Sequence, residues 1–415
     1  MQTKLWSSIS LFIFTTFFLV PVSGFAQKPP INVTGANTGG GVITTGAPFL
    51  LISPDARSGG LGDIGAASAP DAFSQHWNPA KYAFLEEDLS ISLTYSPWLR
   101  NLVDDMNLGY LTASKKIGKR NTLAFSLLYF SLGEVLFVEH PEDPPQGYNP
   151  NEFSIDFSYA RMLTNDFSIA VAARYIYSNL TMGRWVGGVS TQPGQSVAAD
   201  IALFYTKSLN IGKELKGGKI SAGLNISNIG SKISYSTDDL EKDFIPANLR
   251  LGVGFTMDID DFNSISFLGD INKLLVPTSP IYDTTGAIKA GMNTNVGTMT
   301  GIIHSFYDAP GGFKEEMQEI MWSLGAEYWY NKLLAFRLGY FHESIHKGAR
   351  QYFTLGAGIR YNIFALDVSY LIPAVSAKNI NGNNNPLKNT LRFSLTFNFA
   401  NLKKMGKTPK EEELN

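Results

Sequence analysis

The chain has 415 residues, a formal net charge of −2 and no cysteine. The balanced charge gives no electrostatic reason to bind nucleic acid. The lack of cysteine excludes disulfides, thiolate metal sites and a lipidated N-terminal cysteine. A mean hydropathy of −0.03 is too polar for a helical membrane protein, but it is typical of strands whose lipid-facing and lumen-facing residues alternate.

Residues 1–26 are predicted to be a secretory signal peptide. Lys4 supplies the positive charge, residues 9–20 are almost wholly apolar, and Gly-Phe-Ala at 24–26 is a small-x-small cleavage site. The alternative is a membrane anchor helix, which needs a longer apolar run of roughly 20 residues. Cleavage would leave Gln27 as the first residue of the mature chain.

The segment 27–85 differs from everything after it. It opens with a Gly-, Thr- and Asn-rich stretch, and two short helices are predicted, one after Pro54 and one after Pro70 that ends at Pro79. The segment is too polar to face lipid and too irregular to form strands. Irregular backbone is tolerated at membrane depth when it is buried in protein. We therefore expect 27–85 to be a plug inside a barrel.

Residues 86–400 are predicted to form a membrane-spanning antiparallel β-barrel of about fourteen strands. In the last strand, 391–399, apolar residues occupy every odd position and polar residues lie between them, which is the period of a strand with one apolar face. Each candidate is long enough to cross a bilayer, and an even number is usual in bacterial barrels. The predicted strands are 88–97, 107–117, 120–132, 151–162, 166–178, 196–208, 218–230, 247–258, 262–274, 319–330, 332–345, 350–361, 363–373 and 388–399.

The connections between these strands alternate between tight turns and long loops. Outer-membrane barrels have short periplasmic turns and long external loops. We therefore expect an outer-membrane protein with its long loops at the cell surface and both termini in the periplasm. The charged tail, 401–415, is predicted to be a periplasmic extension. The long loops are 131–150, 178–196, 230–247, 274–318 and 373–388.

By strand parity, a set of charged residues points into the lumen. A buried charge is costly unless it is paired, so we expect these residues to form a network with one another or with the plug. The alternative is a water-filled lumen in which each charge is solvated. The set is Asp156, Arg174, Asp200, Arg250, Asp270, Glu327, Arg337, Arg360, Asp367 and Arg392.

No motif in the chain supports catalysis or a cofactor. Residues 342–346 match the H-E-x-x-H zinc pattern, but they follow a strand, where two histidines four positions apart are about 13 Å apart. The acidic stretch 258–263 lacks the spacing of a calcium loop and is expected to be a solvated turn. Residues 314–319 are predicted to form a short helix in the longest loop. We expect no metal and no enzymatic activity.

The layout of a plug followed by fourteen strands resembles the FadL-like barrels, with Asn78, Pro79 and Ala80 matching the element just before the first strand. The longer stretch 45–63, TGAPFLLISPDARSGGLGD, is similar to the N-terminal signature of the PorV (LptO) family, the outer-membrane shuttle proteins of type IX secretion. The similarity in length and layout covers essentially the whole mature chain.

This resemblance implies a non-enzymatic protein that binds the C-terminal signal domain of exported cargo. It would carry the cargo from the translocon to a cell-surface attachment complex that contains a sortase-like enzyme. Loops 131–150, 178–196, 230–247 and 274–318 are the candidate cargo-binding surfaces. The alternative is a FadL-type transporter of hydrophobic small molecules, which requires an apolar pocket near the plug and an opening between strands.

Overall fold

The computed structural model describes residues 41–100, 105–138, 144–181, 183, 185–186, 189–211, 215–237, 242–374 and 385–399. The predicted signal peptide, 1–26, and the predicted tail, 401–415, lie outside the described residues. So does the beginning of the predicted plug, up to residue 40.

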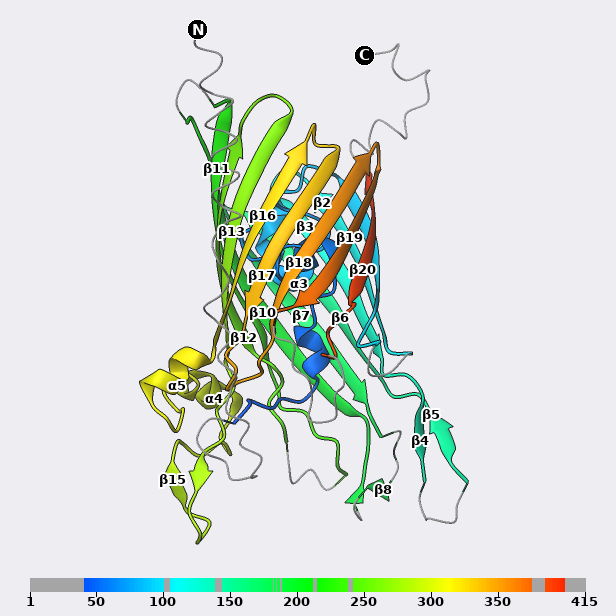
Figure 1. Cartoon of the computed structure of the whole chain (residues 1–415), viewed down its shortest axis with the longest axis vertical. Coiled ribbons are helices and arrows are strands. Elements are labelled where there is room, and N and C mark those ends of the chain that lie inside the picture. Colours follow the sequence, from blue (N-terminus) through cyan, green and yellow to red (C-terminus); the bar gives the residue numbers. More distant parts are fainter. Residues whose placement is uncertain are drawn as a thin grey trace. The chain divides into compact units, whose positions relative to one another are not determined.

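Fourteen antiparallel strands close into a barrel, which confirms the predicted fold class (Figure 1). The first strand pairs with the last, from Leu89 opposite Phe399 to Tyr95 opposite Phe393, so the sheet has no free edge. The strands are β1 (Leu89–Pro97), β2 (Asn107–Ile117), β3 (Asn121–Ser131), β6 (Asn151–Met162), β7 (Phe167–Asn179), β10 (Gly194–Leu209), β11 (Gly217–Gly230), β12 (Asn248–Asp258), β13 (Asn263–Leu274), β16 (Ile320–Tyr330), β17 (Leu334–His342), β18 (Gln351–Tyr361), β19 (Phe364–Pro373) and β20 (Leu391–Phe399).

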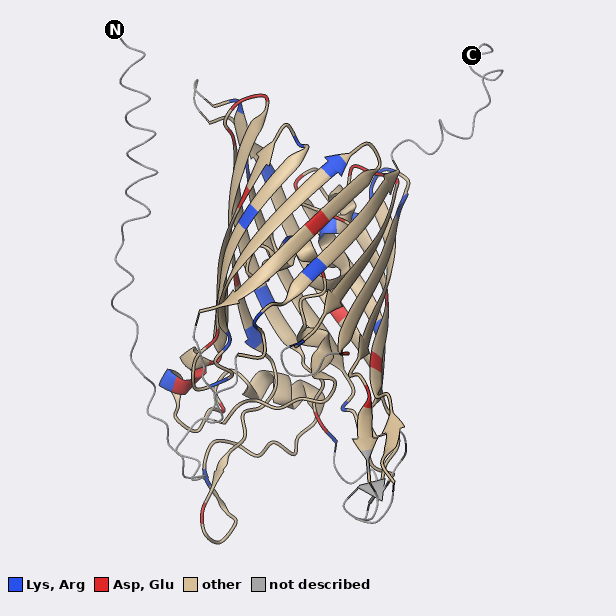
Figure 2. Cartoon of the chain, turned by 45° about the vertical axis from the view of Figure 1, so that its right-hand side comes forward, with Lys and Arg blue, Asp and Glu red and all other residues tan. Residues whose placement is uncertain are grey.

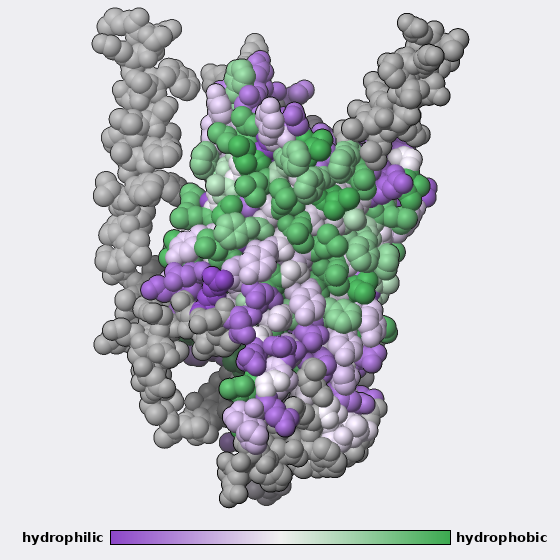
Figure 3. Space-filling view, turned by 90° about the vertical axis from the view of Figure 1, so that its right-hand side faces the viewer, coloured by the Kyte–Doolittle hydropathy of each residue, from purple (hydrophilic) through white to green (hydrophobic). Residues whose placement is uncertain are grey.

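The alternation of side chains decides which face of each strand meets lipid. In β20, Leu391, Phe393 and Leu395 are exposed on the outside, whereas Arg392 and Ser394 are buried on the lumen side. The same alternation in the other strands builds the broad apolar surface visible in Figure 3. Apolar side chains are stable there only against hydrocarbon, so the sequence pattern fixes both the strand and its environment.

Tyrosines on the outer face pair with amide side chains on the neighbouring strand or in the turn next to it. The hydroxyl of Tyr95 donates to Asn107 Oδ1 at 2.6 Å, and that of Tyr159 donates to Asn121 Oδ1 at 2.8 Å. Tyr370 makes an equivalent bond to Asn389 Oδ1 at 2.7 Å. Tyrosine suits the membrane–water boundary because its ring is apolar and its hydroxyl needs a partner. These pairs therefore hold the aromatic girdle in place.

Long connections gather at one end of the barrel, here called the loop end, and tight turns lie at the other (Figure 1). The loop-end connections contain three short hairpins and a helix that were not predicted from the sequence. The hairpin strands have only two or three residues, too few to show a period of two. These are the hairpins β4 (Val135–Phe137) with β5 (Gln146–Tyr148), β8 (Trp185–Val186) with β9 (Val189–Ser190) and β14 (Ile281–Tyr282) with β15 (Ile288–Ala290), and the helix α4 (Thr298–His304). The predicted helix at 314–319 appears as α5 (Phe313–Gln318).

The residues at 45–85, here called the N-terminal segment, lie inside the barrel and contact opposite walls. The α-helix α2 (Ala56–Gly59) packs on β18, β19 and β20, while the 3-10 helix η2 (Pro79–Phe84) packs on β3, β6, β7 and β10. The other two helices are η1 (Pro48–Leu51) and α3 (Ser74–Trp77). None of the helices within the described part of the chain has the length and apolar character needed to cross a membrane.

Candidate functional site

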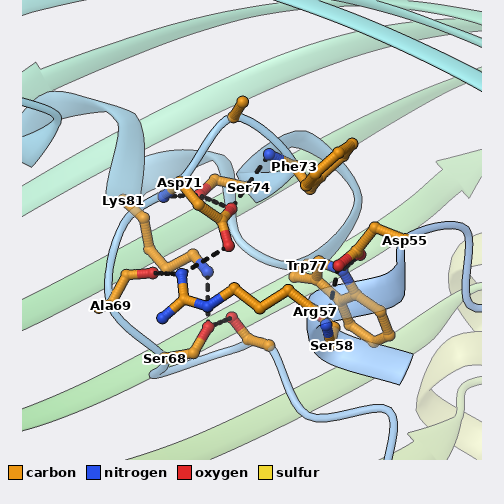
Figure 4. A network of polar contacts seen from close by, with 12 residues as sticks. Asp55, Arg57, Ser58, Ser68, Ala69, Asp71, Phe73, Ser74, Trp77 and Lys81 are labelled. Carbon is orange, nitrogen blue, oxygen red and sulfur yellow. Dashed lines mark hydrogen bonds and ion pairs between the residues drawn. The ribbon is translucent and has the colours of Figure 1, made fainter. Parts of the chain in front are cut away.

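Arg57 lies at the centre of a buried charge network inside the barrel (Figure 4). Its Nε and Nη2 donate to the two oxygens of Glu327 on β16, at 3.0 and 2.9 Å. Its Nη1 donates to Asp71 Oδ2 at 2.8 Å and to the carbonyl of Ala69 at 3.0 Å. This bidentate geometry is the strong form of an arginine–carboxylate pair. One side chain of α2 is thereby fixed both to the wall and to the rest of the N-terminal segment.

The network continues around the wall. Glu327 Oε1 also accepts from Arg337 Nε at 2.8 Å, and Arg337 Nη1 donates to Asp367 Oδ1 at 2.6 Å. All of these side chains are buried. Each carboxylate faces at least one guanidinium, so the cost of removing the charges from water is offset by pairing.

A second buried group lies on the opposite wall. Arg174 on β7 forms ion pairs with Asp156 on β6 and with Asp200 on β10, the latter at 3.1 Å, and it also donates to Asn228. Asp200 Oδ1 accepts from the backbone N–H of Asn228 at 2.8 Å. Four strands are thus tied together by one arginine.

Asp270 on β13 anchors the middle of the N-terminal segment. Its Oδ2 accepts from the backbone N–H groups of Gly65 and Ala66, both at 2.9 Å. Arg250 Nη1 is 3.6 Å from the same oxygen, and its guanidinium lies over the ring of Trp77, 4.5 Å from the centroid.

Arg392 and Arg360 differ in their surroundings. Arg392 is buried, donates from Nε to the carbonyl of Ser53 at 3.2 Å, and lies 3.8 Å from Asp63 Oδ1. Arg360 is exposed near the turn end and lies over the ring of Trp329, 4.3 Å from the centroid. The structure thus brings nine of the ten predicted lumen charges into ion pairs and places Arg360 outside the network.

Asn78, Pro79 and Ala80 form a junction between the N-terminal segment and the wall. The Nδ2 of Asn78 donates to the carbonyls of Ala66 and Leu203, each at 2.9 Å, and its Oδ1 accepts from the N–H of Ala80 at 3.0 Å. Pro79 begins η2, where its missing N–H costs no hydrogen bond. Asn78 therefore caps a helix, closes a loop and binds a strand with one amide.

The predicted set of lumen charges contains strand residues alone, so it misses the charged residues that the N-terminal segment contributes to the buried network. Trp77 Nε1 donates to Asp55 Oδ1 at 2.6 Å, and Lys81 Nζ donates to Ser68 Oγ at 3.0 Å (Figure 4). All four side chains are buried. The available signal was that charged residues stand in a segment otherwise made of small and apolar residues.

The family model described as type IX secretion system protein PorV matches residues 36–281. The chain belongs to the PorV family. It is accordingly an outer-membrane component of type IX secretion, and the family is a non-enzymatic kind of protein. No curated protein sequence matches the chain.

Solved structures similar to this PorV-family chain include two toluene transporters and a FadL homologue. The Ralstonia pickettii toluene transporter TbuX is 14% identical, covering 83% of this chain and 98% of that chain, with a TM-score of 0.42. A Pseudomonas aeruginosa FadL homologue is 11% identical over 87% and 100% of the two chains, with a TM-score of 0.41. The Pseudomonas putida toluene transporter TodX is 8% identical over 83% and 98%, with a TM-score of 0.45.

At the loop end of the PorV-family barrel, a separate group of ion pairs holds the longest loop, 274–318, to the barrel. Lys273 Nζ donates to Glu316 at 3.0 Å and to Glu319 at 2.7 Å. Lys347 Nζ donates to Glu315 at 2.6 Å and lies 3.0 Å from Glu319 Oε1. These five side chains are buried. Figure 2 shows charged residues at this end beside α5 as well as along the strands.

Asp308 belongs to the same loop. Burial raises the pKa of its carboxyl to about 7, with a further contribution from Glu316 and Glu319. Its Oδ2 accepts from the N–H of Thr278 at 3.1 Å. Burial, reinforced by the two neighbouring carboxylates, therefore favours a proton on Asp308.

Helix α5 buries its two carboxylates, and α4 and α5 both expose apolar side chains. Glu315 and Glu316 are each 5% exposed, whereas Ile303 is 57% and Phe313 is 78% exposed. This arrangement inverts that of an ordinary surface helix. We call this surface the α4–α5 face, and it consists of Met299, Ile303, Phe306, Tyr307, Phe313 and Met317. Apolar patches of this kind mark interaction surfaces.

A cavity of about 460 Å³ lies at the loop end, between the beginning of the described chain and the wall. Apolar residues such as Leu51, Trp98 and Leu371 line it, and Lys347 and Arg350 stand at its edge. Both cations are already paired, Arg350 with Glu343 at 2.8 Å.

The H-E-x-x-H residues do not form a metal site. Strand β17 ends at His342, three residues earlier than predicted, and the remainder of the motif lies in a turn. The ring of His342 stacks on Trp322, with centroids 4.9 Å apart, while Glu343 pairs with Arg350. No group of three or more His, Cys, Asp or Glu within the described ranges could hold a metal ion. At 258–263, Asp260 Oδ1 accepts from the N–H groups of Phe262 and Asn263, which closes the turn.

Proposed function

We propose that this PorV-family protein binds the C-terminal signal domain of exported cargo and carries it from the translocon to the cell-surface attachment complex. In this role the protein is a carrier without catalytic activity. The long loops face the cell surface, and both termini lie in the periplasm.

The α4–α5 face is the observation that most supports a protein-binding role. Six large apolar or aromatic side chains are exposed between residues 299 and 317. Of the charged residues in that stretch, Asp308, Glu315 and Glu316 are buried and Lys314 is exposed. Interface cores are enriched in aromatic residues and methionine. The buried ion pairs beneath the helices hold the surface in shape before a partner arrives, which lowers the entropic cost of binding.

A pull-down from native membranes tests the proposal. The double variant Ile303→Ser/Phe313→Ser removes two anchors of the α4–α5 face without touching the buried carboxylates. We expect cargo C-terminal domains recovered with the tagged chain to fall at least tenfold, since losing two apolar anchors costs about 2–4 kcal/mol. The matched control is Phe262→Ser, which removes a 58% exposed side chain from the tight turn between β12 and β13, at the other end of the barrel. Full cargo recovery with the double variant would contradict a docking role for this face.

We further propose that the N-terminal segment acts as the plug and that the lumen does not conduct. Three contacts between the segment and the wall support this role: the ion pair of Arg57 with Glu327, and the hydrogen bonds of Gly65 N–H to Asp270 and of Arg392 to the carbonyl of Ser53. The burial of Trp77 and Tyr82 supports it as well.

The second candidate function is transport of hydrophobic small molecules, and the loop-end cavity favours it. Against it, each of the fourteen strands is hydrogen-bonded to both of its neighbours, so the sheet is closed. Lipid extraction of the purified protein distinguishes the two functions. A stoichiometric fatty ligand in the lumen, together with no cargo partner, would replace the shuttle proposal.

A further inference from the structure

The N-terminal segment packs directly on the backbone of β11 and β12. On the lumen side of β11 and β12, Gly223 and Gly252 stand where any side chain would meet Ala66. A Cβ on Gly252 would lie 2.8 Å from the Cβ of Ala66, and one on Gly223 would overlap the Ala66 carbonyl. Hydrogen bonds hold the contact, since Ser221 Oγ donates to the carbonyl of Ala67 at 2.6 Å. The wall and the segment therefore touch backbone to backbone.

The outer surface of the same wall is hollowed. A groove of about 670 Å³ lies across β10, β11, β12, β13 and β16, and we call it the outer trough. Small residues, Ala222 and Gly269, lie along it, and larger apolar side chains bound it at either side, Leu203 with Tyr205 and Trp322 with Leu324. By strand parity these side chains all face away from the lumen.

The outer trough has no connection to the lumen. The pairing of β11 with β12, of β12 with β13 and of β13 with β16 runs without a break past the trough. A molecule that fills the trough therefore comes from the bilayer. Val253 and Ile271, which also line the trough, are apolar and exposed. Among its outward-facing lining residues, polar groups come from the Tyr205 hydroxyl and the Trp322 indole N–H at its two sides, so the trough offers no charged side chain to a head group.

We propose that the outer trough binds one acyl chain of a bilayer phospholipid. The barrel wall is rigid and does not change shape to fit the surrounding lipid. A concave apolar surface on it therefore binds best a flexible chain that can follow its shape. Strands are about 4.8 Å apart, so a groove across five of them is roughly 20 Å long, compared with a hydrocarbon depth of about 15 Å for one leaflet. The groove is therefore long enough to hold one acyl chain that lies at an angle to the membrane normal. The head group stays outside the trough, at the membrane surface.

The test is native mass spectrometry of the full chain released from nanodiscs made of dioleoylphosphatidylethanolamine. The variant Gly269→Leu fills the trough from the outer face, where a Cβ would make only ordinary contact with Leu324, at 3.4 Å. The matched control is Gly109→Leu, an outward-facing glycine of β2 whose Cβ would meet nothing within 4 Å. We expect the natural chain and Gly109→Leu to retain one phospholipid, and we expect retention to fall at least fivefold in Gly269→Leu.

A second variant, Ala222→Leu, fills the trough from the β11 side and gives an independent reading if Gly269→Leu does not fold. Folding of each variant is checked by the shift in gel mobility on heating. Equal retention in the natural chain, the trough-filling variants and the control would overturn the proposal. It would also be overturned if the retained molecule were a free fatty acid, or if another membrane protein occupied this face in stoichiometric amount. None of these outcomes depends on whether the loops capture cargo.

Discussion

Arg57 shows how single residues hold the interior of this barrel together. It is 3% exposed and forms ion pairs with two carboxylates. One is Asp71, just before α3, and the other is Glu327 on β16. Removing one partner from a buried ion pair costs more than the pair contributes, because the other charge remains buried without compensation. The loss of Arg57 would therefore destabilise the fold mainly because Asp71 and Glu327 would stay buried without this cation.

The variant Arg57→Ala should lower the free energy of unfolding by about 3–5 kcal/mol, since Glu327 and Asp71 each lose a charged partner. Urea unfolding in detergent micelles, followed by tryptophan fluorescence, measures the change. Arg120→Ala is the control, because Arg120 is exposed in a tight turn and its loss should change the free energy by less than about 0.5 kcal/mol. Equal effects of the two substitutions would show that the lumen is wet and the charges solvated.

Strand parity predicts which charges enter the lumen, and local register predicts some of their partners. Asp156 lies opposite Arg174, and Glu327 lies opposite Arg337, each across one tight turn. The contact between Arg57 and Glu327 joins positions 270 residues apart. No local sequence pattern relates two residues so far apart in the chain, so this partner is seen only in the folded structure. Arg360 follows the same parity, but it sits too close to the turn end to be buried.

The strands and the N-terminal segment depend on their surroundings to different degrees. Each barrel strand repeats a period of two over nine or more residues, which made the strands predictable from sequence. The α-helices of the N-terminal segment, α2 and α3, have only four residues each, too few to be stable alone. Their shape comes from contacts with the wall, so the sequence indicated their presence but not their positions.

Glycines on the lumen face set the distance between these two parts. We expect Gly223→Ala to destabilise the protein by about 1–3 kcal/mol, because the added methyl group would overlap the carbonyl of Ala66 and the β-barrel cannot relax freely around it. The change is measured as a shift of the urea midpoint. Gly109→Ala is the matched control, since its methyl group would point into open space outside the barrel. A midpoint for Gly223→Ala that equals the control would mean that the N-terminal segment moves away from the wall at little cost.

At the scale of the whole molecule, the lumen is occupied while the loop end is open to partners. Large side chains of the N-terminal segment, including Phe73, Trp77 and Tyr82, are fully enclosed. Around them, the wall presents serines, threonines and paired charges, together with apolar side chains such as Leu108 and Ile176 that pack on the segment. The apolar part of the lining is thus covered by the segment, which leaves a hydrophobic molecule little free surface to follow. The long loops remain the accessible surface on which a protein partner could act.

A chain that lacks residues 45–77 should therefore form an ion-conducting pore, whereas the natural chain should not. Without the segment, Glu327, Arg337 and Asp270 would line a water-filled lumen, where their charges are solvated and the barrel stays closed through its strand pairing. Single-channel recording in planar bilayers measures the difference as stepwise current. The full-length variant Arg57→Ala is the comparison, because it weakens the anchor but keeps the bulk of the segment in place, so it should conduct far less than the deletion. Stepwise currents of similar size from the natural chain and the deletion would show that the segment does not fill the lumen in the membrane.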